Sequence, residues 1–354
     1  MGQLKVRYPP FESRRLNPSR LPLVQTQTSS NVGGDLKIES SDGWLIERSV
    51  GRATCGGDVD DAAWPRVVRS QRAGWYLQPH PLHRGIRRAI DGIALLMLLT
   101  LLYLFIAPGL ELVGISPWGT NSVRLGLLDY PLLGLVVVPV ILLPLVLRIG
   151  VNVTELRRQR ALIDDVDLSI TVEADLRTSA NHATIRLNGP SAQHATDAAL
   201  AVGVLPPQRR RVLQLLDRRP TGQPPPGSTT EILGINAPTD DGTGFGEDAP
   251  MQHHGWPGGL YLRPMRMGEE GPWEAVDRRG VARLQPPEGP WPGTLYDDIV
   301  LIHWEVVVRF NHPNHGVLMH VTPLKMPWPD AHAMHIKVEA RDGRVELWSH
   351  EPIR

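Results

Sequence analysis

Two histidines and a glutamate toward the C-terminal end of the chain have the residue types that bind a transition metal. His303, Glu305 and His320 lie in two stretches of alternating apolar and polar residues, which predict β-strands. Two imidazoles and one carboxylate can hold zinc or iron. Solvated side chains on the outer face of a sheet explain the same three residues equally well. We expect that second alternative, with no bound metal and no cofactor.

Whether these three residues share a face depends on the register of one predicted hairpin. Residues 296–310 and 316–326 flank the turn sequence NHPNH. Pairing Phe310 with Val317 gathers the large apolar side chains of both strands on one face, which must then be core. In the same register the metal candidates lie together on the opposite face, where we expect them to contact water.

No other group of residues forms a catalytic or cofactor motif. Nine of the 13 histidines follow residue 252. His312 and His315 lie in the predicted turn, where a spacing of three does not bring two rings together as it would on a helix. The chain has no GxSxG, HExxH or Walker sequence, and its single cysteine, Cys55, excludes an intrachain disulfide. We expect a protein without enzymatic activity, and the enzyme alternative is a metal-dependent one.

The most distinctive stretch of the chain, residues 90–149, predicts a two-helix transmembrane hairpin. Residues 90–107 and 132–149 are almost wholly apolar. At about 1.5 Å per residue, each helix would extend about 27 Å, close to the thickness of a hydrocarbon core. Pro139 and Pro144 predict bends in the second helix. Buried core helices of a soluble protein are the alternative.

The distribution of arginines predicts that both ends of this hairpin face the cytoplasm. The loop between the helices has one arginine, Arg124, whereas seven arginines flank the hairpin. Trp118 and Tyr130 in the loop suit the opposite membrane interface. We therefore expect a multi-pass protein of the cell membrane with both termini in the cytoplasm. The flanking arginines are Arg84, Arg87, Arg88, Arg148, Arg157, Arg158 and Arg160.

The balance of 37 basic and 37 acidic residues conceals two arms of opposite charge. Residues 1–89 have a net charge of +6, and residues 150–354 have a net charge of −5. Either the arms attract each other, or the basic arm lies along anionic lipid headgroups. The acidic C-terminal part argues against nucleic acid as a partner. The expected partners are the lipid bilayer, anionic headgroups, and a protein partner or a second copy of the chain.

Composition and periodicity divide the rest of the chain into soluble segments. Residues 64–76, rich in Arg and Trp, suit the headgroup region, a surface groove or an ordinary linker. Residues 191–219 are predicted to be helical in two pieces. The expected segments are a mobile tail (1–34), a small N-terminal segment with a β-hairpin (35–89), the transmembrane hairpin (90–149), a β-hairpin plus a basic helix (150–219), a Pro/Gly-rich insertion (220–295) and an antiparallel β-meander (296–354).

These segments predict a membrane-anchored α+β fold with a β-rich, antiparallel soluble C-terminal domain, built as a sandwich or a barrel. The expected function is a cytoplasmic interaction or assembly module on a two-pass membrane anchor. Two alternatives stay open at this point. One is a metal-dependent, membrane-associated enzyme, and the other is a subunit of an oligomeric channel or transporter.

Overall fold

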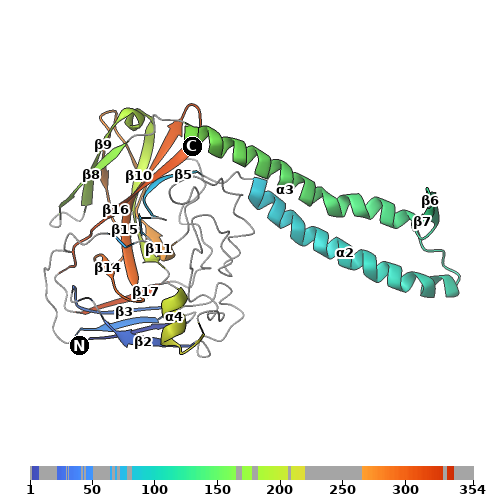
Figure 1. Ribbon diagram of the computed structural model, residues 1–354, viewed down its shortest axis with the longest axis horizontal. Helices are drawn as coiled ribbons and strands as arrows, with labels where there is room; N and C mark the ends of the chain where they lie inside the picture. Colours follow the sequence, from blue (N-terminus) through green and yellow to red (C-terminus); the bar gives the residue numbers. More distant parts are fainter. Residues whose placement is uncertain are drawn as a thin grey trace. The chain divides into compact units, whose positions relative to one another are not determined.

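The chain builds most of its regular structure from β-strands, arranged in several mainly antiparallel sheets in a computed structural model (Figure 1). Two compact units result. The β unit comprises residues 1–78, 159–247 and 252–354, and the helical unit comprises residues 79–158 and 248–251. The structure describes residues 2–7, 22–28, 30, 32–40, 43, 45–50, 64–65, 68–69, 72–77, 82–164, 170–177, 182–205, 209–219, 265–329 and 333–338.

A five-stranded sheet joins the two ends of the described chain. Its order is β17 (Ala333–Val338), β3 (Asp35–Ser40), β4 (Leu45–Ser49), β1 (Gln3–Arg7) and β2 (Val24–Gln27). β17 runs parallel to β3, and the other neighbours are antiparallel. The expected hairpin after residue 35 is present as β3 and β4.

The first strands of this sheet correct the prediction of a mobile tail over residues 1–34. Leu4 and Val6 of β1 and Val24 of β2 are buried in the core. Each run has only one or two apolar positions, too few for a periodic signal. Pairing with a distant strand, β4, orders them instead. Residues 8–21, the Pro-rich centre of the predicted tail, lie outside the described residues.

A seven-stranded sheet forms the centre of the β unit. Its order is β11 (Arg266–Glu270), β10 (Ala195–Leu205), β15 (Leu301–His312), β16 (Gly316–Leu324) and β5 (Gly74–Leu77), and β12 (Glu274–Ala275) and β14 (Leu295–Tyr296) pair with β10 and β15. β10 replaces the first of the two helical pieces predicted within residues 191–219, so that piece is wrong, whereas the second piece contains the helix α4 (Arg209–Leu215). The run AALAVGVL lacks alternation because both faces of β10 are buried.

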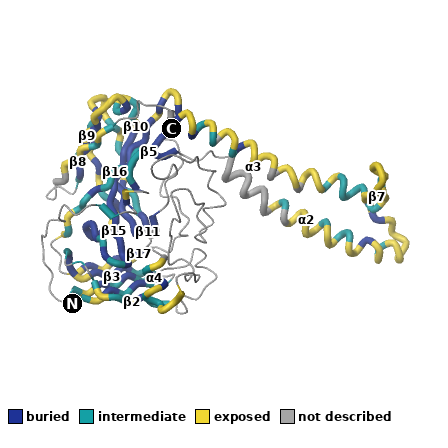
Figure 2. Tube along the Cα trace, in the orientation of Figure 1, coloured by how far each residue is buried: buried dark blue, intermediate teal, exposed yellow. Residues whose placement is uncertain are grey.

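A third sheet has three strands, β13 (Val281–Leu284), β9 (His182–Asn188) and β8 (Thr171–Arg177). The short helices η4 (Pro190–His194) and α4 (Arg209–Leu215) flank β10 in the sequence. One apolar core contains side chains from all three sheets. Figure 2 colours the buried residues of these strands dark blue along the Cα trace. The described sheets do not close, so the expected barrel is not formed.

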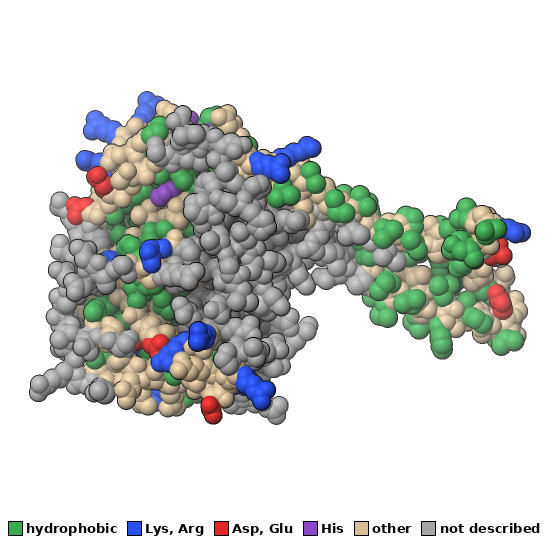
Figure 3. All heavy atoms as spheres, in the orientation of Figure 1, with side chains coloured by type: hydrophobic (Ala, Val, Ile, Leu, Met, Phe, Trp, Pro, Cys, Tyr) green, Lys and Arg blue, Asp and Glu red, His purple; other side chains and the backbone are tan. Residues whose placement is uncertain are grey.

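The helical unit consists of two long helices that run in opposite directions and are connected by a small β-hairpin (Figure 1). α2 (Leu82–Leu112) leads to β6 (Ser122–Leu125) and β7 (Leu128–Pro131), and α3 (Leu132–Asp164) returns. Most of their described apolar side chains are exposed, including Phe105 with 84% exposure. Figure 3 shows hydrophobic side chains along both helices.

Only one of the two helices is a candidate membrane span by its described residues. Leu95–Leu112 within α2 has the length and apolar composition needed to cross a bilayer, and α3 does not pass the same test over the residues described. The structure therefore does not support the predicted two-helix transmembrane hairpin: both helices form, but only α2 is a candidate span among the described residues.

The two arms of the chain fold together. β3, from before the helices, pairs with β17, from after them, and β5 pairs with β16 in the same way. The contact between the oppositely charged arms is therefore made by strand pairing and a shared apolar core. Residues 339–354, the last part of the predicted β-meander, lie outside the described residues.

Candidate functional site

The register of the β15–β16 hairpin differs by one residue from the prediction. Phe310 lies opposite Leu318, and Asn311 lies opposite Val317. β15 is buried on both faces, so burial of one apolar face does not select the register as it would in a half-buried strand. His320 lies opposite Val308 and therefore on the other face of the sheet from His303 and Glu305.

The three candidate metal ligands are therefore not brought together. His303 and Glu305 share one face of β15, and His320 lies across the sheet from them. Among the described residues, no group of three or more His, Cys, Asp or Glu side chains could hold a metal ion. The alternative of a metal-dependent enzyme was based on these three residues, and their arrangement does not support it.

His303 and Glu305 are also buried, whereas we expected them to contact water. The side chains of both residues have no exposed surface. The covering layer includes Trp64, Val68 and Tyr76, from the segment expected to be a headgroup contact, a groove or a linker. This segment instead ends in β5, an edge strand of the central sheet.

A buried ion pair joins that covering layer to the central sheet. Arg72 Nε donates to Glu305 Oε2 at 2.8 Å, and a second guanidinium nitrogen bonds Oε1 of the same carboxylate. Neither side chain has exposed surface. A two-point contact of this kind fixes both the position and the orientation of the guanidinium.

His303 extends the ion pair into a row of four polar side chains. Its Nε2 lies 3.2 Å from Glu305 Oε2, within ion-pair distance but without the angle of a hydrogen bond. Its Nδ1 lies 2.8 Å from the hydroxyl of Tyr296, whose ring stacks on the imidazole. The row Arg72, Glu305, His303 and Tyr296 is our candidate functional site, and we name it the buried polar row.

Burial and one fixed charge determine the protonation of this row. Burial lowers the pKa of His303 against the attraction of Glu305, so the ring is neutral. Burial acts to raise the pKa of Glu305, but the charge of Arg72 and the close contacts with His303 and Arg72 outweigh burial, so the pKa is lowered. Burial raises the pKa of the Tyr296 phenol. The row therefore contains one cation, one anion and two neutral groups, and the charges balance.

This arrangement can stabilise a unique packing, because it fixes the position of each side chain in the row. Nucleophilic or metal chemistry requires groups that the row does not combine. All four members of the row come from β14, β15 and the segment before β5. We interpret the row as the connection between the central sheet and the chain that leads into α2.

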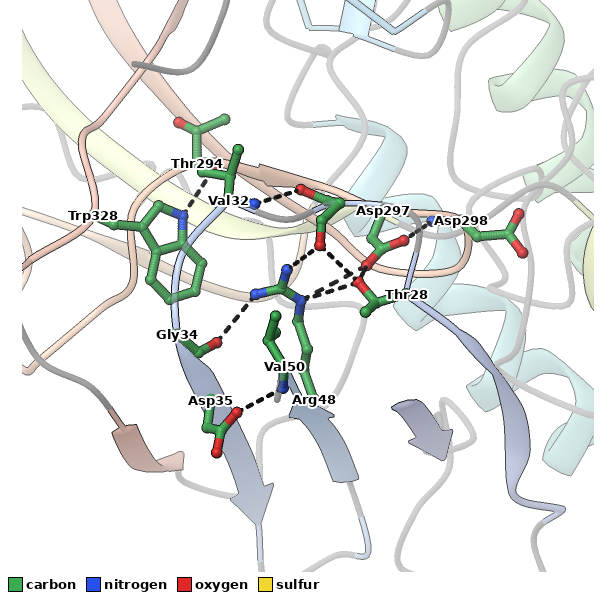
Figure 4. A network of polar contacts seen from close by, with 11 residues as sticks. Thr28, Val32, Gly34, Asp35, Arg48, Val50, Thr294, Asp297, Asp298 and Trp328 are labelled. Carbon is green, nitrogen blue, oxygen red and sulfur yellow. Dashed lines mark hydrogen bonds and ion pairs between the residues drawn. The ribbon is translucent and has the colours of Figure 1, made fainter. Parts of the chain in front are cut away.

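A second buried network lies in the five-stranded sheet (Figure 4). Arg48 of β4 donates to the carbonyl oxygens of Gly34 at 3.1 Å and Ser30 at 2.5 Å. Its Nε lies 3.7 Å from Asp297 Oδ2, and Thr28 donates its hydroxyl to the same carboxylate oxygen. Asp297 comes from the C-terminal arm, so this network also joins the two arms.

Trp328 covers the guanidinium of Arg48. The Arg48 Cζ atom lies 5.9 Å from the centre of the indole ring, and the indole nitrogen donates to Thr294 O at 3.1 Å. Gly33 has a φ of +79°, and a Cβ atom there would lie 2.3 Å from the Trp328 ring. Glycine is therefore required at this position for both its conformation and its size.

Sequence reasoning found His303 and Glu305 but missed the residues that bind them. Arg72 pairs with Glu305 across 233 residues of sequence, and Arg48 approaches Asp297 across a similar distance. A single arginine in a polar segment gives no signal of burial. The one sequence feature that could have indicated the burial of Arg72 is the combination of tryptophan and arginine in residues 64–76. This combination suits a segment that covers a sheet as well as a headgroup contact.

The histidines of the turn also differ from the expectation. The rings of His312 and His315 stack with their centres 4.8 Å apart, and His194 lies 5.3 Å from His312. The turn after β15 folds back on itself, so a spacing of three does bring the rings together. His335 has the same spacing from His332 and contacts Glu39, and His332 lies outside the described residues.

His320 predicts a pH-dependent stability. It packs edge-on against Trp75, and burial lowers its pKa to about 4 from an ordinary value of 6.5. Between these two values the unfolded chain binds more protons, so the folded state loses stability as pH falls, by up to about 1.4 kcal/mol per pH unit. We expect the urea midpoint to fall from pH 7 to pH 5 and His320→Phe to reduce that fall. An unchanged pH dependence in this variant would contradict the assignment.

Comparison of the chain with models of protein families, with curated proteins and with solved structures gave no match. The function is therefore argued from the residues and their arrangement.

Proposed function

We propose that this chain is a two-pass membrane protein whose β unit is a cytoplasmic interaction or assembly module. The observation that carries the proposal is the exposed apolar surface of α2. Leu98, Leu101 and Phe105 have exposures of 62%, 57% and 84%. A contiguous apolar surface of this extent is unstable in water and stable in a hydrocarbon core.

The co-folded arms support the second crossing. Strands β3 and β5 precede α2, and their partners β17 and β16 follow α3. Both arms must therefore lie on the same side of any membrane, and the chain between them must cross it an even number of times. If α2 crosses, α3 is the segment available to return.

The composition of α3 is consistent with this role. No charged residue occurs from Leu132 to Leu147, which covers about 24 Å of helix at 1.5 Å per residue. Val136, Leu143 and Val146 are exposed by 51%, 53% and 61%. The helix continues to Asp164, and its basic end carries Arg157 and Arg160, both exposed. Arginines at this end favour the cytoplasmic side and anionic headgroups.

The β unit has the properties of a binding or assembly module. Its buried polar row holds structural contacts, and the sheets offer edge strands such as β2 and β8 to a partner. An oligomeric channel or transporter remains the alternative, and it requires several copies of the helical unit around a common axis.

Charge insertion into α2 tests the membrane assignment. Leu101→Arg with Leu102→Arg places two charges near the centre of the proposed span, at about 2.5–3.5 kcal/mol each. We expect the wild-type protein to stay in the membrane pellet after an alkaline carbonate wash and this variant to be released. Val317→Arg, at a partly exposed apolar position of β16, is the matched control and should stay in the pellet. Release of the wild-type protein would refute the proposal.

A further inference from the structure

The connection between α2 and α3 carries an exposed apolar surface of its own. β6 and β7 pair with Leu125 opposite Leu128 and Val123 opposite Tyr130, so these four side chains share one face. Leu125 and Leu128 have exposures of 53% and 60%. Leu127 in the turn has an exposure of 95%.

The opposite face of this hairpin is polar. Arg124 lies directly across from Asp129 in the strand register, and Ser122 is on the same side. The hairpin is thus amphipathic, with an apolar face that no described side chain covers. A two-stranded hairpin with an uncovered apolar face is marginally stable in water, and a second phase in contact with that face would stabilise it.

The backbone of the connection is hydrogen-bonded internally at both helix ends. Gly114, with a φ of +82°, ends α2, and the N–H groups of Gly114 and Ile115 donate to Glu111 O and Leu110 O. At the start of α3, the N–H groups of Leu132 and Leu133 donate to loop carbonyl oxygens at 3.0 and 2.9 Å. Backbone groups satisfied in this way can enter a membrane interface at low cost.

The charge of the connection indicates which lipid it would contact. Glu111, Arg124 and Asp129 are the charged residues between Leu110 and Leu132, with a net charge of −1. Such a segment has no electrostatic attraction to an anionic surface and suits zwitterionic headgroups. Trp118, with an exposure of 66%, and Tyr130 are the aromatic types that prefer the headgroup region.

We propose that the β6–β7 hairpin lies in the headgroup layer of the leaflet away from the β unit. Its apolar face and Leu127 contact acyl chains, and Arg124 and Asp129 face water. The inference rests on the proposed membrane crossing. The exposed apolar surface of α2 continues into the connection through Leu112 and Val113, so a membrane that contains α2 would also contact the connection.

Environment-sensitive labels test this position in the full-length protein. Cysteines at Leu128, Ser122 and Val140 are introduced singly in a Cys55→Ser background, labelled with a nitrobenzoxadiazole dye, and reconstituted in phosphatidylcholine vesicles. Position 128 tests the apolar face of the hairpin, position 122 is the matched control on its polar face, and position 140 reports on α3.

We expect blue-shifted emission at position 128, quenched by lipid with a shallow nitroxide, and iodide quenching several-fold weaker than at position 122. Equal iodide quenching at 128 and 122, with 140 shielded, would overturn the interfacial position and leave the membrane crossing intact. Shielding of 128 from both quenchers, with a dependence on protein density, would overturn it in favour of a second copy. Iodide quenching at 140 would refute the membrane crossing itself.

Discussion

Replacing Arg72 with methionine should lower the free energy of unfolding of the β unit by about 3–5 kcal/mol, because it leaves the Glu305 carboxylate buried without its cation. The carboxylate has no exposed surface and receives two bonds from the guanidinium. The remaining neighbour, His303, is an imidazole whose pKa is lowered by burial, so it is a weaker partner for the carboxylate than the guanidinium. The midpoint of chemical denaturation, followed by tryptophan fluorescence of the full-length protein, measures the loss.

Two further variants make this prediction specific. Lys5→Met removes the cation of a partly exposed pair with Glu47, which should cost at most about 1 kcal/mol. Arg72→Met combined with Glu305→Met removes both buried charges and should recover much of the loss, because no unpaired charge remains. A loss in Arg72→Met no larger than that in Lys5→Met would show that the buried polar row is not a strong contact.

The parts of the fold that sequence reasoning predicted are those with local signals. The hairpins β8–β9 and β3–β4 have the alternation expected of half-buried strands. Both long helices form where apolar residues are continuous. In each case neighbouring residues contain enough information to select the structure.

The parts that were wrong depend on distant pairing. β10 has alanines and no alternation, so its strand conformation is determined by β15, more than 100 residues later, at Ala199 opposite Val307. β1 has two apolar positions and is ordered by β4. The predicted register assumed a solvated face on β15, and a second covering layer removed that assumption.

In the candidate site, too, local patterns were predicted correctly and contacts between distant segments were not. His303 and Glu305 were identified together because they alternate on one strand, and their burial was not expected because the covering segment comes from before the helices. Arg72 belongs to that segment, and no local pattern distinguishes it from the neighbouring arginines. The one-residue register shift then separated His320 from the group.

Sided labelling of single cysteines tests the central claim, a chain that crosses the membrane twice and folds both arms on one side. Ser122→Cys reports on the connection between the helices, Gln27→Cys on β2 of the N-terminal arm, and Glu288→Cys on an exposed loop of the C-terminal arm. All three are made in a Cys55→Ser background and treated with a membrane-impermeant thiol reagent in intact cells. Labelling after permeabilisation shows that each cysteine is reactive.

We expect position 122 to react in intact cells and positions 27 and 288 to react only after permeabilisation, because the paired strands of the two arms require a common side and the arginines favour the cytoplasm. Reaction of 27 and 288 without 122 would reverse the orientation and keep the hairpin. Reaction of only one of positions 27 and 288 in intact cells would contradict the account, because the arms could not then share β-sheets.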